Sequence, residues 1–212
     1  MVSPRLFQVV GGTTSLPLCF MTHQSSAAEV LLFWFGPAAE RGKAHKRWFV
    51  KDEAFDREVR ERFLPLYEDA AAGQLAHLKQ RADGCLALIV VLDQFPRNMF
   101  RGTARAFATD PLALEAARHA LAEGFDRALL PVERLFAYLP FEHSEALADQ
   151  DRSCELTQAL DAYPETNDVY RYAVLHRDMI RRFGRFPHRN AILGRVSTPE
   201  ELEFLKGPGS SF

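Results

Sequence analysis

The sequence has little of what β-strands, disulfide frameworks or membrane spans require. Threonine and isoleucine are scarce, and no segment alternates polar and apolar residues for long enough to predict a strand. The three cysteines, Cys19, Cys85 and Cys154, lie far apart and form no C-x-x-C pair, which argues against a disulfide framework or a thiolate zinc site and favours a reducing compartment. The longest strongly apolar run, Cys85 to Leu92, is far shorter than the ~20 residues that cross a bilayer. We therefore expect a cytoplasmic protein with no membrane partner.

The overall charge is also small. The 212 residues carry a formal net charge of −2, so no global field attracts the chain to nucleic acid, and we expect no such partner. Hydrophobic residues make up 47% and charged residues 25%, which is typical of a folded globular chain and argues against a disordered or fibrous one. Neither an H-x-x-x-H nor an H-E-x-x-H spacing occurs, and we expect no bound metal and no cofactor.

The N-terminus differs from the rest of the chain. It loosely resembles a secretory signal, but Gln8, a Gly-Gly-Thr-Thr-Ser run and Pro17 interrupt the apolar stretch that such a signal needs. We predict that residues 1–28 are a disordered N-terminal extension, with Met21 as an alternative native start. Residues 29–212 are predicted to form a single domain, in line with the usual size of domains.

Apolar residues recur every three to four positions through most of this domain. From Asp52 onward they form one stripe along a helix that ends near Gly73. Residues 84–95 are apolar on every side until Asp93, which predicts a central helix surrounded by others. Asp110 followed by Pro111 predicts a cap and a first-turn proline for a further helix.

Later helix starts are predicted at Pro131, Ser144, Asp168 and Thr198. The predicted fold class is therefore all-α. Helices of about ten to twenty residues with short connections favour antiparallel neighbours, as in helical bundles and in stacked helical hairpins. The sequence does not choose between a compact bundle and a short solenoid.

One short motif occurs twice. Phe95-Pro-Arg-Asn-Met-Phe-Arg-Gly102 is matched by Phe186-Pro-His-Arg-Asn-Ala-Ile-Leu-Gly194. The residue before proline avoids the α region, so in each copy Phe-Pro should end the incoming helix and open one new turn that closes at glycine. The structural explanation is that similar corners arose from similar local chemistry. The functional explanation uses the free N–H groups of a helix start and guanidinium groups to favour an anion at Arg97, Asn98, Arg189 and Asn190.

Charged residues are distributed unevenly towards the C-terminus. Arginine outnumbers lysine 21 to 5, and seven arginines lie between Arg171 and Arg195. Five acidic residues lie between Glu142 and Glu155. The simpler explanation is that the two segments pair across a partly buried interface, because arginine makes bidentate contacts with carboxylates. The alternative is a site for an anion or a nucleotide.

Two histidines are candidate catalytic residues. His176 lies on the apolar stripe of its predicted helix, so its ring faces the core, where Asp93 or Glu142 would hold it. His143 precedes a predicted helix start, and Glu142, His143 and Asp149 together give only a weak metal signal. Each histidine is explained by a structural role or, alternatively, as a general base. Asp93 ends an apolar helix, and its carboxylate needs hydrogen bonds that arginines would supply.

Several longer runs resemble a known family. They are Leu32-Phe-Trp-Phe-Gly36, Leu92-Asp-Gln-Phe-Pro-Arg-Asn-Met-Phe-Arg-Gly102, Ala106-Phe-Ala-Thr-Asp-Pro111, Leu139-Pro-Phe-Glu-His-Ser-Glu145 and Arg181-Arg-Phe-Gly-Arg-Phe-Pro-His-Arg-Asn190. Over residues 29–212 the chain resembles the bacterial domain-of-unknown-function family 924. The resemblance implies an all-helical fold similar to tetratricopeptide-repeat (TPR) proteins. It implies no established activity, so no catalytic residue can be carried over.

Two functions remain open at this point. In the first, antiparallel hairpins form a TPR-like protein whose polar pocket binds a peptide or a small anionic ligand. In the second, the chain is a hydrolase-type enzyme that uses His143 or His176 as general base, with arginines stabilising an anion. The predicted ligand-binding residues are Asp93, Arg97, Asn98, Glu142, His143, Asp149, His176, Arg185, Arg189 and Asn190.

Overall fold

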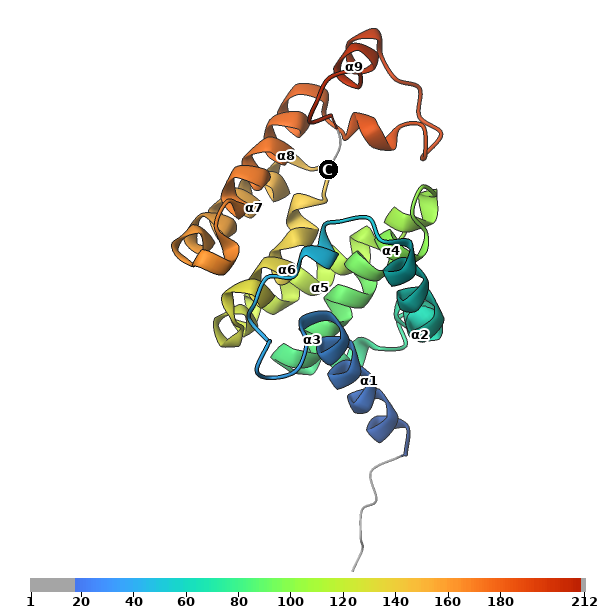
Figure 1. Ribbon diagram of the computed structural model, residues 1–212, viewed down its shortest axis with the longest axis vertical. Helices are drawn as coiled ribbons and strands as arrows, with labels where there is room; N and C mark the ends of the chain where they lie inside the picture. Colours follow the sequence, from blue (N-terminus) through green and yellow to red (C-terminus); the bar gives the residue numbers. More distant parts are fainter. Residues whose placement is uncertain (1–17, 211–212) are drawn as a thin grey trace, which may run out of the picture.

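The computed structural model describes residues 18–210, with side chains from residue 27 onward, and every regular element in this range is helical (Figure 1). This confirms the all-α prediction for the described residues. Residues 1–17, most of the predicted N-terminal extension, lie outside the described range. The helices are α1 (Leu18–Phe35), α2 (Glu53–Ala71), α3 (Ala82–Ile89), α4 (Phe95–Met99), α5 (Asp110–Ala122), α6 (Pro131–Glu142), α7 (Leu147–Gln158), α8 (Val169–Phe183) and α9 (Pro199–Phe204).

Short helical turns connect these helices. One of them, η3 (Val90–Gln94), is π-helical and joins α3 directly to α4. The others are 3₁₀ turns: η1 (Lys46–Trp48), η2 (Ala76–Gln80), η4 (Ala104–Phe107), η5 (Phe125–Ala128), η6 (Ala159–Ala162), η7 (Pro164–Thr166) and η8 (Pro187–Arg189).

Aromatic side chains fill the core of the first half of the chain. The rings of Trp34 and Phe35, at the end of α1, are completely buried. Phe136 of α6 contacts both edge-on, with ring centroids 5.6 and 5.4 Å away. Phe95 lies 5.7 Å from Trp34. Such pairs contribute about 0.5–1.5 kcal/mol each beyond the apolar area that they bury, so α1, α4 and α6 are fixed around one aromatic cluster.

The predicted central helix is confirmed as α3 with its continuation η3, which are buried on every side from Gly84 to Gln94. Gly84 permits its close approach to the preceding turn, because a Cβ there would lie 2.5 Å from the carbonyl oxygen of Leu78. At the start of α2 the Asp52 carboxylate caps the helix, since it accepts the backbone N–H groups of Ala54 and Phe55.

The prediction that Phe95-Pro96 ends the incoming helix was wrong. Phe95 keeps α-helical dihedral angles, and its N–H bonds to the carbonyl of Val90, five residues earlier. Pro96 has no N–H to donate, and the wider π-helical turn before it accommodates this residue, so the chain continues into α4. In the matching motif Pro187 opens the new turn η8 as predicted, but α8 already ends at Phe183, where Gly184 in the left-handed conformation closes it before Phe186-Pro187 is reached.

Two predicted caps were also wrong. Thr109 is the N-cap of α5, and Asp110 is the first helical residue, with its carboxylate turned to a side chain instead of the helix N–H groups. The N-cap of α7 is Ala146, two residues after Ser144. The Ser144 hydroxyl accepts the Ala146 N–H at 3.2 Å and closes the turn before the helix. Asp110 pairs with Arg97 of α4, and the Ser144 hydroxyl donates to Asp149 inside α7, so in both places a side-chain pair replaces the predicted cap.

α7 and α8 form an antiparallel hairpin in the upper part of the molecule (Figure 1). Asp151, near the start of α7, pairs with Arg181, near the end of α8, at 2.9 Å, which fixes the direction. This confirms antiparallel neighbours for these two helices. Stacking of the hairpins in the manner of TPR repeats stays a prediction.

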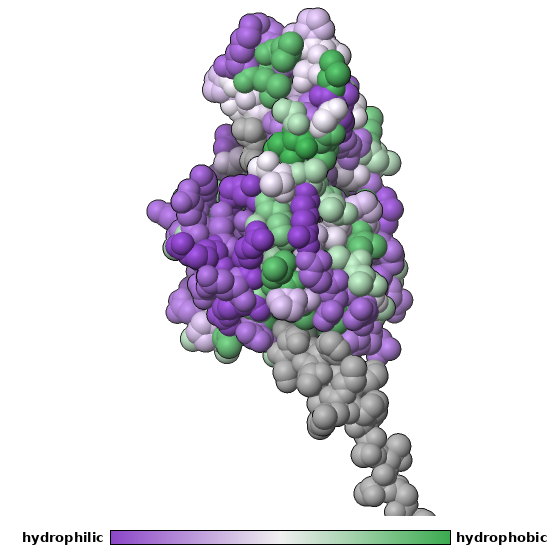
Figure 2. Space-filling view, turned by 90° about the vertical axis from the view of Figure 1, so that its right-hand side faces the viewer, coloured by the Kyte–Doolittle hydropathy of each residue, from purple (hydrophilic) through white to green (hydrophobic). Residues whose placement is uncertain are grey.

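The chain beyond α6 has its own small apolar cluster of Met179, Ile180 and Phe186. We call residues 147–210 the C-terminal lobe and residues 18–146 the body. The lobe closes with α9, where Thr198 and Glu201 form the predicted capping box. On the face shown in Figure 2, hydrophilic atoms cover much of the described surface, and a narrower hydrophobic band crosses it. The polar residues of interest lie between the two apolar clusters.

Candidate functional site

Seven charged or titratable side chains meet where the body joins the C-terminal lobe. The body supplies them from η3, α4, the start of α5 and the end of α6, and the lobe supplies them from α8 and η8. The contacts described below link them in two adjoining groups. We call them the polar seam: Asp93, Arg97, Asp110, Glu142, His143, His176 and Arg189.

Asp93 and His143 form a tight pair in the seam. Asp93 is fully buried, and its Oδ1 lies 2.7 Å from His143 Nδ1. Burial opposes ionisation of Asp93, but Arg97 and His143 outweigh it and lower the pKa of Asp93 to about 2. Burial, with the nearby Arg97 charge, lowers the pKa of His143. Asp93 is therefore ionised at neutral pH and accepts the Nδ1 proton of a neutral His143.

This pairing determines the state of the other imidazole nitrogen. With its proton on Nδ1, His143 carries a lone pair on Nε2. Among the described residues none hydrogen-bonds to that nitrogen. The His143 side chain is 14% exposed, so the ring is within reach of solvent. A carboxylate that orients a histidine in this way is an arrangement found in general-base catalysis.

Asp110 lies between two arginines. Arg97 donates to both of its carboxylate oxygens, at 2.8 and 3.1 Å, and Arg189 approaches Oδ2 at 3.5 Å. Arg97 also donates to the backbone carbonyl of Asp93 at 2.5 Å. Arg97 is thus well paired, whereas the contact of Arg189 with Asp110 is longer than a good hydrogen bond.

Arg189 is held between two aromatic rings. Its guanidinium carbon lies 4.7 Å from the ring centroid of Phe107 and 4.3 Å from that of Phe186. One terminal nitrogen donates to the carbonyl of His143 at 3.0 Å. In the described part of the chain its buried Nε has no hydrogen-bond partner. Burial, together with the like charge of Arg97, lowers the pKa of Arg189 to about 10, which shows that its charge is incompletely compensated.

Glu142 and His176 form a second buried pair of the seam. Glu142 Oε1 lies 3.1 Å from His176 Nδ1, which also donates to the backbone carbonyl of Tyr172 at 2.9 Å. This confirms that Glu142, one of the two predicted partners, holds His176. Burial, reinforced by the Asp93 charge, raises the pKa of Glu142 to about 8, and burial lowers the pKa of His176 to about 3. Both groups are therefore neutral near pH 7.

Two of the predicted ligand-binding residues, one in α4 and one in α7, pair with residues outside the polar seam. Asn98 donates to Asp56 at 2.7 Å, on the side of α4 that faces α2. Asp149 accepts the Ser144 hydroxyl at 2.7 Å and Arg118 at 2.5 Å. Each is therefore occupied by neighbours outside the polar seam.

The other two, Arg185 and Asn190, lie in the C-terminal lobe near α9. Arg185 makes a bidentate pair with Glu201, at 2.6 and 2.7 Å. The Asn190 side-chain amide donates to Glu201 at 3.2 Å and to Ser197 at 3.0 Å. These contacts tie α9 to the end of α8, so they stabilise the lobe and do not reach the seam.

Three residues of the site did not come from sequence reasoning. Asp110 was interpreted as a helix cap, and Phe107 and Phe186 were not considered as neighbours of an arginine. A usable signal existed, because Phe107 and Asp110 both lie in the Ala106 to Pro111 run that resembles the family.

The predicted pairing of the acidic and basic segments is confirmed in part. Arg195 makes a bidentate pair with Glu145, at 2.7 and 3.0 Å, and Arg181 pairs with Asp151. Among the described residues, no group of three His, Cys, Asp or Glu side chains is placed to hold a metal ion. Within the same residues no helix is both long and apolar enough to cross a bilayer.

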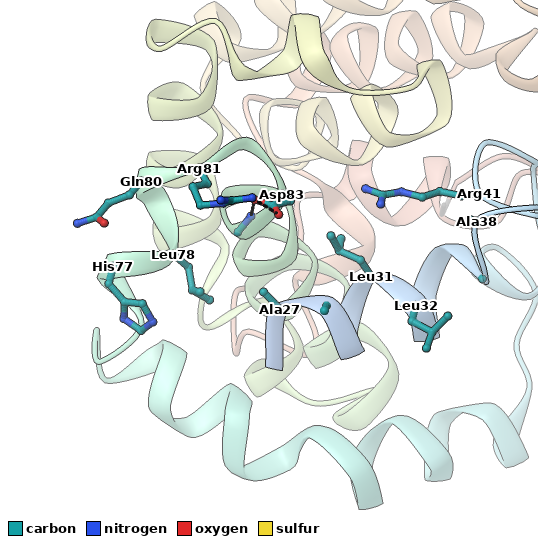
Figure 3. A pocket seen from close by; sticks show the side chains of 13 residues that line it. Ala27, Leu31, Leu32, Ala38, Arg41, His77, Leu78, Gln80, Arg81 and Asp83 are labelled. Atoms are coloured by element: carbon teal, nitrogen blue, oxygen red, sulfur yellow. Dashed lines mark hydrogen bonds and ion pairs between the residues drawn. The ribbon is translucent and has the colours of Figure 1, made fainter. Parts of the chain in front are cut away.

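A cavity of about 410 Å³ lies away from the seam, between α1 and the corner from η2 to α3 (Figure 3). Its walls are formed mainly by residues 27–41 and 77–84. A more open hollow lies beside Pro131 and Pro164. Neither is lined by a residue of the polar seam, so the seam is a narrow junction and not a wide pocket.

Comparisons with known proteins place the chain in a family. A search of curated proteins gives no match. Among solved structures, the chain is similar to "Structure of Protein of Unknown Function ATU0120 from Agrobacterium tumefaciens", with 43% sequence identity and a TM-score of 0.78 over 87% of this chain and 99% of that chain. The family model described as "Bacterial protein of unknown function (DUF924)" matches residues 30–209. The chain therefore belongs to the DUF924 family of bacterial proteins, as the resemblance of its sequence motifs indicated.

Proposed function

We propose that this protein binds a small ligand through an oxyanion, a carboxylate or a phosphate group, at Arg189 in the polar seam. The observation that carries the proposal is the state of Arg189: its guanidinium is buried between two rings, yet its Nε has no partner among the described residues. The Nε edge of a guanidinium is one that carboxylates and phosphates bind in bidentate fashion. An oxyanion there would accept a hydrogen bond from a buried N–H group, which costs free energy when it is buried without a partner.

The surrounding charges support this choice. Arg97 lies on the other side of Asp110, so two guanidinium groups share one carboxylate at this point. The lowered pKa of Arg189 reflects burial and the repulsion from Arg97, and a bound anion would relieve both. Partial exposure of Arg97 and Asp110, 19% and 17%, gives the ligand an approach from solvent.

The size of the opening favours a small ligand over an extended peptide. Arg189 and His143 are only 8% and 14% exposed at the side chain. A phosphate, a small carboxylic acid or the terminal carboxylate of a peptide would reach the guanidinium, whereas the backbone of a long peptide would need a groove. The cavities described above lie elsewhere.

The test is a titration of the purified protein with phosphate, sulfate, acetate and citrate, followed by thermal unfolding and calorimetry. We expect saturable stabilisation by at least one oxyanion, about 2.7 kcal/mol at 100 times its dissociation constant. Arg189→Lys keeps the positive charge but removes the bidentate edge, so binding should weaken at least tenfold. Arg182→Lys, at an exposed arginine paired with Glu200, is the matched control and should leave binding unchanged. Equal binding in the Arg189→Lys variant would contradict the proposal.

A hydrolase-type activity is the second candidate, and the Asp93–His143 pair favours it. In such a reaction His143 Nε2 would take a proton from a water molecule, the water oxygen would attack an acyl or phosphoryl centre, and the proton would pass to the leaving group. Arg189 would stabilise the negative charge of the transition state.

Turnover of phosphate and carboxylate esters separates the two candidates. If the protein is an enzyme, His143→Asn should remove turnover while the variant still melts near the wild-type temperature. If it only binds, no ester is turned over, and His143→Asn should retain oxyanion affinity because Arg189 remains in place.

A further inference from the structure

The cavity between α1 and the corner from η2 to α3 has an apolar floor and polar ends. Ala27, Leu31 and Leu78 line its middle. In Figure 3, Arg41 lies at one end of the cavity, and Gln80 and His77 lie at the other, with Leu31 and Ala27 between them. Its volume of about 410 Å³ is in the range of ligand-binding cavities. This arrangement fits an elongated apolar molecule with one polar end.

Arg41 is held in place through one of its three guanidinium nitrogens. Its Nε is ion-paired with Glu133, which is almost fully buried and also accepts the backbone N–H of Leu130 at 3.0 Å. This fixes the orientation of the guanidinium. Among the described residues its terminal nitrogens have no hydrogen-bond partner, and the side chain is 35% exposed. The free terminal nitrogens are thus available to a second carboxylate at the end of the cavity.

Arg81, the other arginine of the cavity, does not offer such a donor pair. Its guanidinium makes a bidentate contact with Asp83, at 3.1 Å to each oxygen, and its side chain is 70% exposed. A ligand carboxylate would have to compete with Asp83 and with water there. Charge complementarity therefore places an anionic group of a ligand at Arg41.

We propose that this cavity binds a medium-chain monocarboxylate, with its carboxylate on the terminal nitrogens of Arg41 and its hydrocarbon chain over Ala27, Leu31 and Leu78. The apolar walls supply affinity in proportion to the hydrocarbon area that they cover, and Arg41 fixes the direction of the chain. This site shares no residue with the polar seam and does not depend on the function proposed for it.

A chain-length series tests the proposal directly. Calorimetric titrations with butyrate, hexanoate, octanoate and decanoate should give a dissociation constant that falls about fourfold for each added methylene, until the cavity is filled and the constant levels off. Octanol, which has the same hydrocarbon but no charge, should bind at least tenfold more weakly than octanoate. Equal binding of octanol and octanoate would overturn the role of Arg41.

Variants of the cavity give the second arm of the test. Ala28 lies on the exposed surface of α1 and lines the cavity, so Ala28→Trp should fill it and weaken octanoate binding at least tenfold with little effect on folding. Arg41→Gln should weaken octanoate binding at least tenfold and leave octanol binding unchanged. Arg81→Gln is the matched control, and we expect less than a twofold change. Arg41→Gln leaves Glu133 without its partner, so the melting temperature of this variant is measured as well. If Arg41→Gln unfolds, Ala28→Trp still tests the site.

Each outcome decides the proposal. Loss of binding in both Ala28→Trp and Arg41→Gln, with Arg81→Gln like wild type, supports it. A larger effect of Arg81→Gln than of Arg41→Gln would overturn the orientation. Octanoate binding that is absent up to millimolar concentration, or unchanged in Ala28→Trp, would overturn the site itself.

Discussion

The body and the C-terminal lobe are held together by different forces. In the body, completely buried rings such as Trp34, Phe95 and Phe136 contact one another in a continuous apolar core. In the lobe, Leu160 joins the core of the body, while the separate cluster of Met179, Ile180 and Phe186 is small. Bidentate arginine–carboxylate pairs such as Arg185–Glu201 hold the elements around that small cluster. Apolar burial is strong and largely independent of direction, whereas bidentate pairs give orientation with little net stability. The end of the lobe, from Met179 to α9, is therefore oriented more by ion pairs than by apolar packing.

The polar seam lies at the junction of these two regions. A junction between a rigid core and a weaker unit can hold buried polar groups that are not fully satisfied, as Arg189 shows. Unsatisfied groups of this kind lower stability and are expected where a ligand completes their hydrogen bonds. The following experiments test whether the body and the lobe differ in stability, and whether Arg97 and Arg189 differ in their contribution to it.

The largest expected effect on stability comes from removing a buried ring, and it should differ between the body and the lobe. Phe136→Ala removes a fully buried ring from the body and should lower the free energy of unfolding by about 3–5 kcal/mol. Phe186→Ala removes a fully buried ring from the lobe and should act locally. Amide hydrogen exchange should then accelerate at the end of α8 and in α9 while the amides of α1 to α6 keep their protection. Uniform acceleration in Phe186→Ala would mean that body and lobe unfold as one unit.

The second experiment compares the two arginines on either side of Asp110. Arg97→Met leaves fully buried Asp93 and its neighbour Asp110 without their best-bonded guanidinium, and should cost about 3 kcal/mol or more. Arg189→Met keeps an apolar chain between Phe107 and Phe186 and removes an incompletely paired cation, so its effect should be about 1 kcal/mol or less.

Urea unfolding of both variants measures the difference. The slopes of the two transitions should match that of wild type, so that the midpoints report stability alone. If Arg189→Met costs as much as Arg97→Met, Arg189 is a structural residue, and the proposed oxyanion site loses its physical basis.

The smallest effect concerns the proton on Glu142. In the unfolded chain a glutamate has a pKa near 4.3, whereas burial and the charge of Asp93 raise the pKa of Glu142 to about 8 in the fold. Between these values the folded state holds a proton that the unfolded state has released, so stability falls as pH rises towards 8. His176, whose pKa is lowered to about 3, has the opposite effect, but only below its ordinary value of about 6.5.

The window from pH 6.5 to 8 therefore isolates Glu142 from His176. We expect wild-type stability to decline across this window and the decline to be reduced in Glu142→Gln, which stays neutral and keeps a polar side chain next to His176. Urea midpoints at several pH values measure this. A parallel decline in wild type and variant would show that another group titrates there and that Glu142 is already ionised.

The sequence predicted the helices well, because apolar spacing is a local property. The stripe that begins at Asp52 and the fully apolar stretch ending at Asp93 correspond to α2 and to α3 with η3. It also identified six residues of the polar seam as candidate ligand-binding residues, because charged groups at the ends of apolar helices need partners. These six are Asp93, Arg97, Glu142, His143, His176 and Arg189. Sequence reasoning failed at Pro96, where a π-helical turn carries the chain on into α4, and at Asp110, whose carboxylate pairs with Arg97 instead of capping α5.

Composition and periodicity by themselves determined an all-helical chain with an arginine-rich C-terminal segment, because hydrophobic spacing and helix signals act over a few residues. Only the tertiary structure decided which charges meet. Arg185 and Arg189 are four residues apart, yet one is fully paired with Glu201 and the other lies between two rings with a donor unused. That difference depends on where the body places Phe107 and Asp110. Sequence patterns that act over a few residues do not determine which distant segments come into contact.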